Sequence, residues 1–270
     1  MVEFISFGSG SSGNCYYFRK GDDSFVIDMG IGIRRFKNYC RMYGISLSKI
    51  QAVFLTHDHT DHSLAAGAFS QELGVPVYTS DLVHKGIVRN YHVRKKIKPE
   101  HTKVLEQGGS IRVGDFTITS FNVPHDSAQN NGYFISTSCG FNFCLCTDVG
   151  HVTTEMETFI QRAQYLVIEA NYDLAMLLTG SYPGFLKTRI MGPNGHLCND
   201  ETAQALLNFA SDYCKKVWLC HLSEENNRPQ HALDAVMHAF RKAGREDFFQ
   251  NCTLEALPRT EPTNFFSLEE

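Results

Sequence analysis

Short runs of apolar and β-branched residues, separated by glycine and polar turns, dominate the first half of the chain. Runs of this length bounded by turn residues predict β-strands. They occupy residues 3–7, 14–18, 24–30, 52–57, 75–80, 110–123, 132–137 and 141–150. Apolar residues spaced three or four positions apart predict amphipathic helices at residues 33–44, 63–74, 151–163, 200–214 and 231–244.

Strands joined first by turns and then by helices predict an α/β fold, in which sheets pack on each other and helices cover the outside. The chain has 270 residues, and no proline-rich linker or fixed-period repeat divides it, so we expect a single domain over residues 1–270. The final segment, residues 257–270, has two prolines and an acidic end. It predicts a surface tail that packs, if at all, through Phe265 and Phe266.

Composition and charge exclude several classes of protein. A content of 43% hydrophobic and 20% charged residues is typical of a globular protein. The formal net charge of -4 excludes binding to nucleic acid through net charge alone, so any polyanion site must be local. No run approaches the roughly 20 apolar residues of a membrane span, and the first residues do not resemble a signal peptide. We therefore expect a cytoplasmic protein without a membrane partner, whose 9 cysteines, lacking a CxxC pair, stay reduced.

A dense group of metal-binding residue types follows the apolar run 52–55. Three histidines and two aspartates stand in six positions: His57, Asp58, His59, Asp61 and His62. Imidazole and carboxylate groups are good ligands for zinc, manganese and iron. His57 and His59 point the same way on an extended segment, and Asp61 and His62 can turn toward a second ion where a helix begins. A solvated polar loop explains this density less well than a metal site.

Further candidate ligands close other strand-like runs. His125 follows residues 117–124, Asp148 follows residues 141–147 and His221 follows residues 215–220. A single histidine at a strand end is more often structural, but three such residues add to the cluster at 57–62. By charge and number we expect one ion on His57, His59 and His125, a second on Asp61, His62 and His221, and Asp148 bridging the two.

Two divalent ions about 3.5–4 Å apart can share a hydroxide and stabilise charge on an attacked phosphoryl or carbonyl group. The predicted chemistry is therefore hydrolysis. Asp28 closes the run 24–28 and is expected to accept a ring N–H from a ligand histidine, which fixes its tautomer. Asp58 is a weaker candidate for the same role.

The order Asp28, residues 57–62, His125, Asp148 and His221 resembles the five motifs of the metallo-β-lactamase fold superfamily. The resemblance covers residues 5 to about 230. It implies a four-layered αββα sandwich with the metals at the edge between two sheets. The HxHxDH motif with a bridging aspartate resembles the hydrolase and nuclease branches rather than the antibiotic-hydrolysing zinc enzymes.

Segments 8–14, 123–126, 147–150, 169–173, 195–199 and 221–227 are similar to the small bacterial YycJ/WalJ-type family. That resemblance implies a DNA exonuclease that acts from 5′ ends and is tied to mismatch repair. The chain has Cys198 and His151 where the family pattern leads us to expect serine and an aromatic residue. Neither position belongs to the metal motifs, so the departure concerns substrate preference.

Three groups of residues are candidates for contact with a phosphate chain. The glycine- and serine-rich loop 8–14 carries Ser9, Ser11 and Ser12, which can approach a phosphate, although a plain hairpin turn explains the loop equally well. His196, in the segment 194–201, can protonate a leaving oxygen or bind a phosphate, or it can simply bond a loop carbonyl. Lys187 and Arg189 lie near His196 in sequence and belong to this second group as further possible phosphate contacts.

The third group is a basic stretch, residues 84–103, in which seven lysines and arginines face the single acidic residue Glu100. Arg94, Lys95 and Lys96 stand at its centre, and Tyr91 can stack on a base. Such local charge in an acidic chain favours a polyanion partner. A solvated helix face remains an equal alternative.

We expect a two-metal phosphodiesterase, foremost a DNA exonuclease, in which Asp61, Asp148 and His196 carry the chemistry. RNA as a substrate stays open. The alternatives are a hydrolase of a small ester, thioester, lactone or phosphodiester, and a metal-binding regulatory protein without turnover. A redox di-iron role lacks a domain that would deliver electrons. Residue types alone do not distinguish Zn, Mn and Fe.

Overall fold

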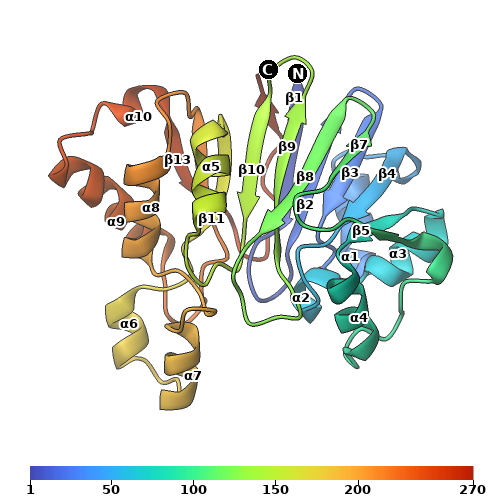
Figure 1. Cartoon of the computed structure of the whole chain (residues 1–270), viewed down its shortest axis with the longest axis horizontal. Coiled ribbons are helices and arrows are strands. Elements are labelled where there is room, and N and C mark those ends of the chain that lie inside the picture. The colour runs from blue at the N-terminus through green and yellow to red at the C-terminus, as the bar shows by residue number, and fades with distance from the viewer. Residues whose placement is uncertain (270) are drawn as a thin grey trace.

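Two seven-stranded sheets form the centre of the computed structural model, which describes residues 1–269. The first sheet has the strand order β14-β1-β2-β3-β4-β5-β6 (Figure 1). Its strands are β1 (Val2–Gly8), β2 (Cys15–Lys20), β3 (Asp23–Ile27), β4 (Ile50–Phe54), β5 (Val77–Thr79), β6 (Thr102–Val104) and β14 (Phe266–Leu268). The strands from β3 to β6 run parallel, whereas β14, β1, β2 and β3 pair antiparallel.

The second sheet repeats this division, with the order β13-β12-β11-β10-β9-β8-β7. Strands β10 to β13 are parallel, and β7 to β10 are antiparallel. The strands are β7 (Ser110–Val113), β8 (Phe116–Asn122), β9 (Asn131–Thr137), β10 (Asn142–Cys146), β11 (Tyr165–Glu169), β12 (Lys216–Cys220) and β13 (Thr253–Ala256). Because β8 and β10 both oppose β9, the carboxyl ends of β8, β10, β11 and β12 meet at one edge.

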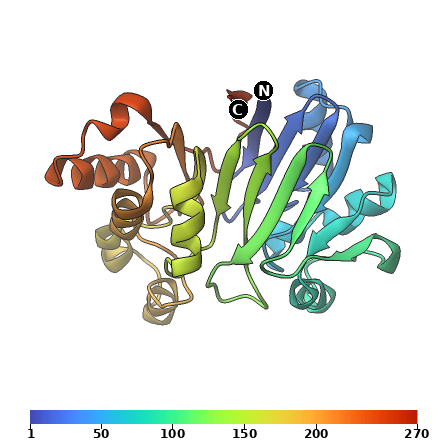
Figure 2. The same ribbon diagram turned by 45° about the horizontal axis from the view of Figure 1, so that its top comes forward.

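Helices cover the outer face of each sheet, and Figures 1 and 2 show them on opposite sides of the molecule. One group packs on the first sheet: α1 (Ile33–Met42), α2 (Thr60–Ser63), α3 (Ala66–Leu73) and α4 (Asp81–Arg89). The other follows the second sheet: α5 (Thr154–Arg162), α6 (Leu174–Thr179), α7 (Gly184–Ile190), α8 (Asn199–Phe209), α9 (Pro229–Lys242) and α10 (Phe248–Asn251). Short 3-10 turns span Leu47–Lys49 and Pro99–His101. Among residues 1–269, every helix is too short or too polar to span a bilayer.

The layer between the two sheets is an aromatic core. Phe18 and Phe25 stack with ring centroids 5.0 Å apart, and Phe143 of the second sheet meets Phe18 edge-on at 4.9 Å. Trp218, fully buried on β12, lies 5.0 Å from Phe4 on β1. Aromatic side chains bury large apolar areas, so this layer joins the sheets face to face. The order helix, sheet, sheet, helix confirms the predicted αββα sandwich.

The prediction of a surface tail over residues 257–270 is wrong for strand β14, although the packing expected of Phe265 and Phe266 is present, and Glu270 lies outside the described residues. Residues Phe266–Leu268 form strand β14, which pairs with β1 at the edge of the first sheet. Phe266 lies 5.0 Å from Trp218, and the side chains of Leu257 and Leu268 are buried. The prolines mark the loop that leads to this strand rather than a loose end.

Candidate metal centre

Three aspartate and histidine residues that close strands have unusual backbone conformations. Asp28 follows β3, Asp148 follows β10 by two residues and His221 follows β12, with φ of 60°, 56° and 53°. Among residues 1–269 these are the only residues other than glycine with positive φ. Such conformations cost on the order of 1–3 kcal/mol each and concentrate at functional sites, because the surrounding structure must hold them. The local bends turn the three side chains toward one centre.

The metal loop, residues 57–62, is held by main-chain hydrogen bonds from the first sheet. The N–H groups of Asn14 and Met29 donate to the carbonyl oxygens of Asp61 and His62, both at 2.7 Å. Gly30 lies so close that an added Cβ would be 1.5 Å from the Asp61 carbonyl oxygen. Only glycine fits there, so this close main-chain contact fixes the position of the metal loop.

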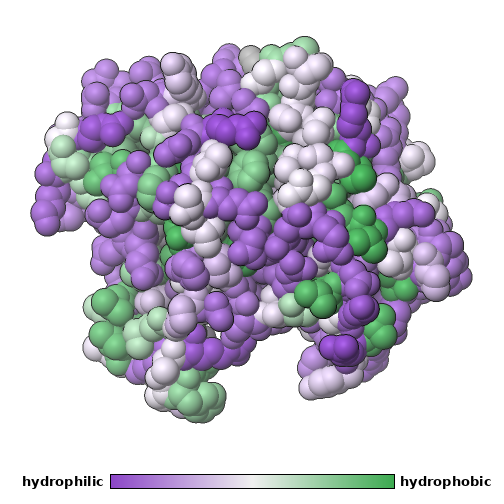
Figure 3. All heavy atoms as spheres, viewed as in Figure 1, coloured by the Kyte–Doolittle hydropathy of each residue, from purple (hydrophilic) through white to green (hydrophobic). Residues whose placement is uncertain are grey.

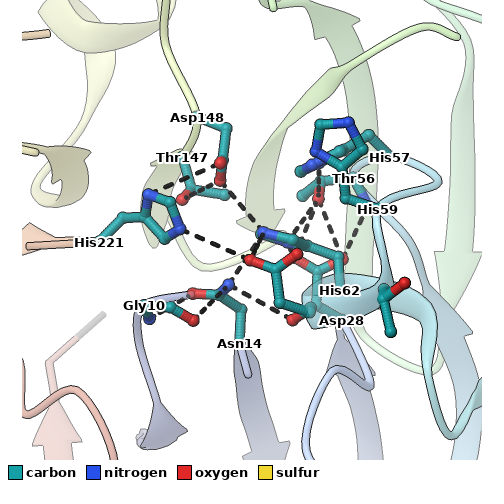
Figure 4. Close-up of polar contacts among 12 residues, drawn as sticks. Gly10, Asn14, Asp28, Thr56, His57, His59, His62, Thr147, Asp148 and His221 are labelled. Atoms are coloured by element: carbon teal, nitrogen blue, oxygen red, sulfur yellow. Dashed lines mark hydrogen bonds and ion pairs between the residues drawn. The ribbon is translucent and has the colours of Figure 1, made fainter. Parts of the chain in front are cut away.

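The structure brings all the predicted ligands together. The ligand atoms of His57, His59 and His125 lie within 4.8 Å of one another, and so do those of Asp61, His62 and His221. Asp148 lies between these two groups, as Figure 4 shows in part. Its carboxylate oxygens are 3.2 Å from His62 Nε2, 3.7 Å from His125 Nε2 and 3.6 Å from His221 Nδ1.

Four histidines of the cluster direct Nδ1 to a protein partner, so that Nε2 faces the centre, where Nε2 of His62 also contacts the side-chain amide of Asn14 at 2.8 Å. A histidine that binds a metal through one nitrogen commonly bonds its other nitrogen to a carboxylate, carbonyl or similar group. The partners are Thr56 Oγ1 for His57 at 3.0 Å, Asp28 Oδ2 for His62 at 2.7 Å, the Gly195 carbonyl for His125 at 3.0 Å and Glu169 Oε1 for His221 at 2.9 Å.

The buried nitrogen atoms that remain fit a metal centre. Nε2 of His57 and Nε2 of His221 are buried and make no hydrogen bond. A buried polar atom without a partner is costly, so these two nitrogens call for a ligand. Burial and the neighbouring His62 hold the pKa of His57 well below its usual value. The neutral imidazole that results is the form that binds a metal.

Carboxylates and histidines in the cluster stabilise each other's charged forms. Burial alone raises the pKa of Asp148, but His221 and His62 outweigh it and hold the pKa well below the ordinary value. Burial lowers the pKa of His221, whereas Asp148, Asp61 and Glu169 raise it, to about 10. Protons on His221 and His62 therefore balance the carboxylates when no cation is bound, and a metal ion displaces them.

Asp28 lies where the sequence predicts, beneath a histidine of the metal loop. Its fully buried carboxylate accepts hydrogen bonds from Thr56 N–H at 2.9 Å, from Thr56 Oγ1 and from the His62 ring. Asp58 does not share this role. Its Oδ1 accepts from the N–H of Ala128 at 3.0 Å, and its side chain packs against Gly86 of α4. Asp58 thus joins the metal loop to α4 and to the loop after β8.

Glu169, at the end of β11, belongs to the centre although sequence reasoning gave it no role. It is fully buried between β10 and β12. Its Oε1 accepts from His196 Nδ1 at 2.8 Å and from His221, while Oε2 accepts from the N–H groups of Val149 and Leu197. A usable signal was present, since Glu169 is an acidic residue that closes the apolar run 165–168, as Asp28 and Asp148 close theirs.

His196 lies at the rim of the cluster, with its side chain 19% exposed. Its ring centroid is 5.0 Å from that of His125, and its Nδ1 is 4.0 Å from Asp148 Oδ1. Burial lowers the pKa of His196, but the neighbouring Glu169 raises it by more, so the pKa lies above its usual value. The predicted position beside the metal ligands is what the structure shows.

The serine loop divides into buried and exposed parts. Ser9 is fully buried; its Oγ bonds the Tyr16 hydroxyl at 2.9 Å and accepts from the His221 N–H at 3.1 Å. It therefore supports His221 and is not placed to bind substrate, which corrects the prediction. Ser11 and Ser12 are exposed. Ser11 lines a cavity of about 190 Å³ with Tyr182, Arg189 and His196.

The basic residues predicted to contact phosphate also differ in whether they are free to do so. Lys187 is not available for phosphate, because its Nζ donates to the carbonyls of Leu178 and Gly180, both at 2.8 Å. Arg189 remains 58% exposed at the cavity while it pairs with Asp126. Lys96 Nζ is occupied by carbonyl oxygens on α4 and at its end. Arg94 and Lys95 are exposed.

These two exposed residues lie close to the metal loop. Asn90, at the end of α4, donates from its side chain to the carbonyl of Asp58 at 2.9 Å and to Thr60 Oγ1 at 3.2 Å. An added Cβ on Gly67, at the start of α3, would meet the main chain of Lys95 at 2.0 Å. The segment 90–96 is therefore packed beside α2 and α3, next to the loop that carries His57 and His59.

The family described as "Beta-lactamase superfamily domain" matches residues 24–221, a range that holds every strand-end residue of the centre. The chain belongs to the metallo-β-lactamase fold superfamily. It is a metal-dependent hydrolase with a histidine and aspartate cluster that can bind divalent metal ions.

Two relatives are similar to the chain over most of their length. The chain is 28% identical over 243 residues to "Exodeoxyribonuclease YycJ" of Bacillus anthracis, covering 90% of each chain. It is 30% identical over 219 residues to "Exodeoxyribonuclease WalJ" of Streptococcus pneumoniae, covering 81% of each. Among solved structures, the metallo-β-lactamase fold protein YhfI from Bacillus subtilis aligns with a TM-score of 0.69 at 18% identity, covering 97% of this chain and 98% of that one. The last likeness shows the fold alone.

Proposed function

We propose that this superfamily member is a two-metal DNA exonuclease that removes nucleotides from 5′ ends. The observation that carries the proposal is the position of Asp148, whose carboxylate lies between two groups of ligands. The similarity of the chain to two relatives named exodeoxyribonucleases supports DNA as the substrate. The 5′ polarity rests on resemblance to that family.

In this proposal His57, His59 and His125 hold one ion, and Asp61, His62 and His221 hold the other. Two bound divalent ions supply a nucleophile at neutral pH and neutralise negative charge that develops on the phosphoryl group. Zn, Mn and Fe all suit this ligand set. The protein supplies the fixed ligand directions, through the Nδ1 hydrogen bonds described above.

His196 is proposed to protonate the leaving oxygen. Its Nδ1 is held by Glu169, which outweighs burial and raises the pKa of His196, so the protonated ring is favoured. The other ring nitrogen is then the proton donor to substrate. A general acid whose pKa lies near the working pH gains the most from such a position.

Substrate DNA is proposed to lie across the metal loop, with exposed basic residues on either side of its path. Arg94 and Lys95 are exposed on one side of the loop, and Arg189 lines the cavity beside His196 on the other. Figure 3 shows the molecular surface hollowed between the lobe of α6 and α7 and the lobe of α4. Cations along such a path attract phosphates and release counterions.

We further propose that residues 1–270 act as one domain in the cytoplasm. The free state of all nine cysteines, eight of them buried, suits a reducing compartment.

The test is degradation of duplex DNA labelled at either the 5′ or the 3′ end, with matched RNA and bis(p-nitrophenyl) phosphate as further substrates. The metal-free protein is supplied with Mn²⁺ or Zn²⁺. We expect metal-dependent release of the 5′ label as a mononucleotide before the 3′ label is lost. Rapid turnover of the small diester with intact DNA and RNA would instead support a hydrolase of small substrates.

A further inference from the structure

A second hollow of the molecule lies beside α4 and contains none of the predicted metal ligands. It is a groove of about 530 Å³ between α4, the loop after Lys96 and strand β6. The face of α4 that points away from the groove carries Gly86 and leads to Asn90, and both residues contact Asp58 of the metal loop. The lining residues are His84, Lys85, Ile87, Val88, Arg89, Ile97, Pro99 and Thr102.

The floor of this groove is apolar and open to solvent. Val88 is 64% exposed and lines the groove together with Ile97 and Pro99. Two further exposed apolar side chains stand on the same elements, Leu82 on α4 at 51% and Val104 on β6 at 53%. Strand β6 is the last of its sheet, so no further strand from the described residues, 1–269, covers this edge. Apolar side chains gathered at an open edge and rimmed by charge are typical of interaction sites.

The charged side chains that line the groove, Lys85 and Arg89, are both basic. Two acidic residues lie nearby, because burial lowers the pKa of His84 overall while Asp81 of α4 and Glu106 after β6 both act to raise it. Lys85 has one partner, Asp81, on its own helix at 2.5 Å. Within residues 1–269 no carboxylate forms an ion pair with Arg89 or with Lys103 on β6, although the whole chain is acidic. In Figure 3 hydrophobic and strongly hydrophilic side chains lie next to one another over the lobe that holds α4 in Figure 1.

We propose that this groove binds an acidic peptide segment of another protein, which places an apolar side chain on Val88 and Ile97. Its carboxylates pair with Lys85 and Arg89. The phosphates of a DNA strand would satisfy the cations, but none of the described residues that line the groove is a phenylalanine, tyrosine or tryptophan on which its bases could stack. An acidic segment with an apolar anchor uses both halves of the site, and a buried anchor supplies most of the affinity of such interfaces. The surface proposed for DNA, around Arg94 and Lys95, is a separate one beside the metal loop.

The test is fluorescence anisotropy with the full chain and a labelled peptide of four aspartates followed by leucine and phenylalanine. A second peptide carries serines in place of the two apolar residues. We expect saturable binding of the first peptide, weakened at least tenfold by Val88→Asp and by Arg89→Glu. Binding should also weaken when salt is raised, since ion pairs at the rim are screened.

Matched controls are Met42→Asp, at a methionine 71% exposed on α1, and Arg34→Glu, at an exposed arginine of the same helix. Both should leave peptide binding unchanged. Circular dichroism and melting of each variant check that it folds. Equal binding of the serine peptide, or no binding of either peptide, would overturn the proposal. Loss of single-stranded DNA binding in Val88→Asp and Arg89→Glu without peptide binding would make the groove a nucleic-acid surface.

Discussion

At Glu169 one buried carboxylate serves two histidines, His196 and His221, through the same oxygen. Replacing it by glutamine keeps the volume and removes the charge that raises the pKa of His196. His196 then loses its proton at a lower pH, so the alkaline limb of the plot of kcat against pH should move to lower pH. We expect a 10–100-fold loss of activity, as is usual for groups that support metal ligands.

The measurement is kcat against pH for Glu169→Gln, with bound metal counted in each sample. Glu157→Gln on α5, a partly exposed glutamate away from the cluster, is the control and should match the parent chain. An unchanged profile in a fully metallated Glu169→Gln enzyme would show that the carboxylate does not set the protonation of His196.

The residues of the centre differ in how far the sequence alone reveals them. His57, His59 and His62 are visible because their density in one loop has no other ready explanation. Asp148 and His221 are visible because each closes a strand. Asn14, which bonds the His62 ring at 2.8 Å, carries no such mark, because its role arises only when the first hairpin packs on the metal loop. Ser9 was misjudged for the same reason.

At the scale of elements, strand β14 tests whether the end of the chain is part of the fold. Leu268 is 3% exposed and packs in the core between the sheets. Leu268→Ala should lower the free energy of unfolding by about 2–4 kcal/mol, since a buried leucine leaves a cavity. Met42→Ala, at an exposed site, should change it by less than about 0.5 kcal/mol. Urea unfolding followed by fluorescence compares the two, and equal small effects would mean that β14 does not hold the sheet.

Elements were predictable in proportion to the length and regularity of their patterns. The runs behind β1 to β5 and β7 to β10 alternate or stay apolar over several residues, and the helices α1, α5, α8 and α9 repeat apolar residues every three or four positions. Helices α6 and α7 have only 6 and 7 residues and few buried side chains, so they leave no periodic signal. Strand β6 has only 3 residues and forms by pairing with the edge strand β5, which its own sequence does not reveal.

At the scale of the whole molecule, bound metal should stabilise the fold, because the cluster joins the ends of strands from both sheets. A ligand present at a thousand times its Kd adds about 4 kcal/mol. For a chain of this size we expect a chelator to lower Tm by on the order of 10 °C. Thermal melts with EDTA, and with Mn²⁺ or Zn²⁺ restored, measure this. His57→Ala should lose most of the metal effect, and His92→Ala, at an exposed histidine, should keep it; a melt insensitive to proven metal loss would contradict the assignment.

Charge on the outer surface should govern binding of long DNA without changing the chemistry. Reversing Arg94 and Lys95 to glutamate should weaken DNA binding and flatten the slope of log K against log salt by about 2. Hydrolysis of bis(p-nitrophenyl) phosphate should stay near the parent rate. The control is Arg34→Glu with Lys242→Glu, which reverses equal charge on other exposed helical positions. Equal loss in both double variants would mean that only net charge matters.

The measurement that tests the central claim most directly is 5′-label release from duplex DNA by Asp148→Asn beside Asp212→Asn. Both changes remove one carboxylate charge, but only Asp148 lies between the two ligand groups, whereas Asp212 is 85% exposed and pairs with Arg245 on the surface. We predict that Asp148→Asn abolishes metal-dependent release while Asp212→Asn retains most of it. Full activity in a folded Asp148→Asn protein would contradict a two-metal centre built on this carboxylate.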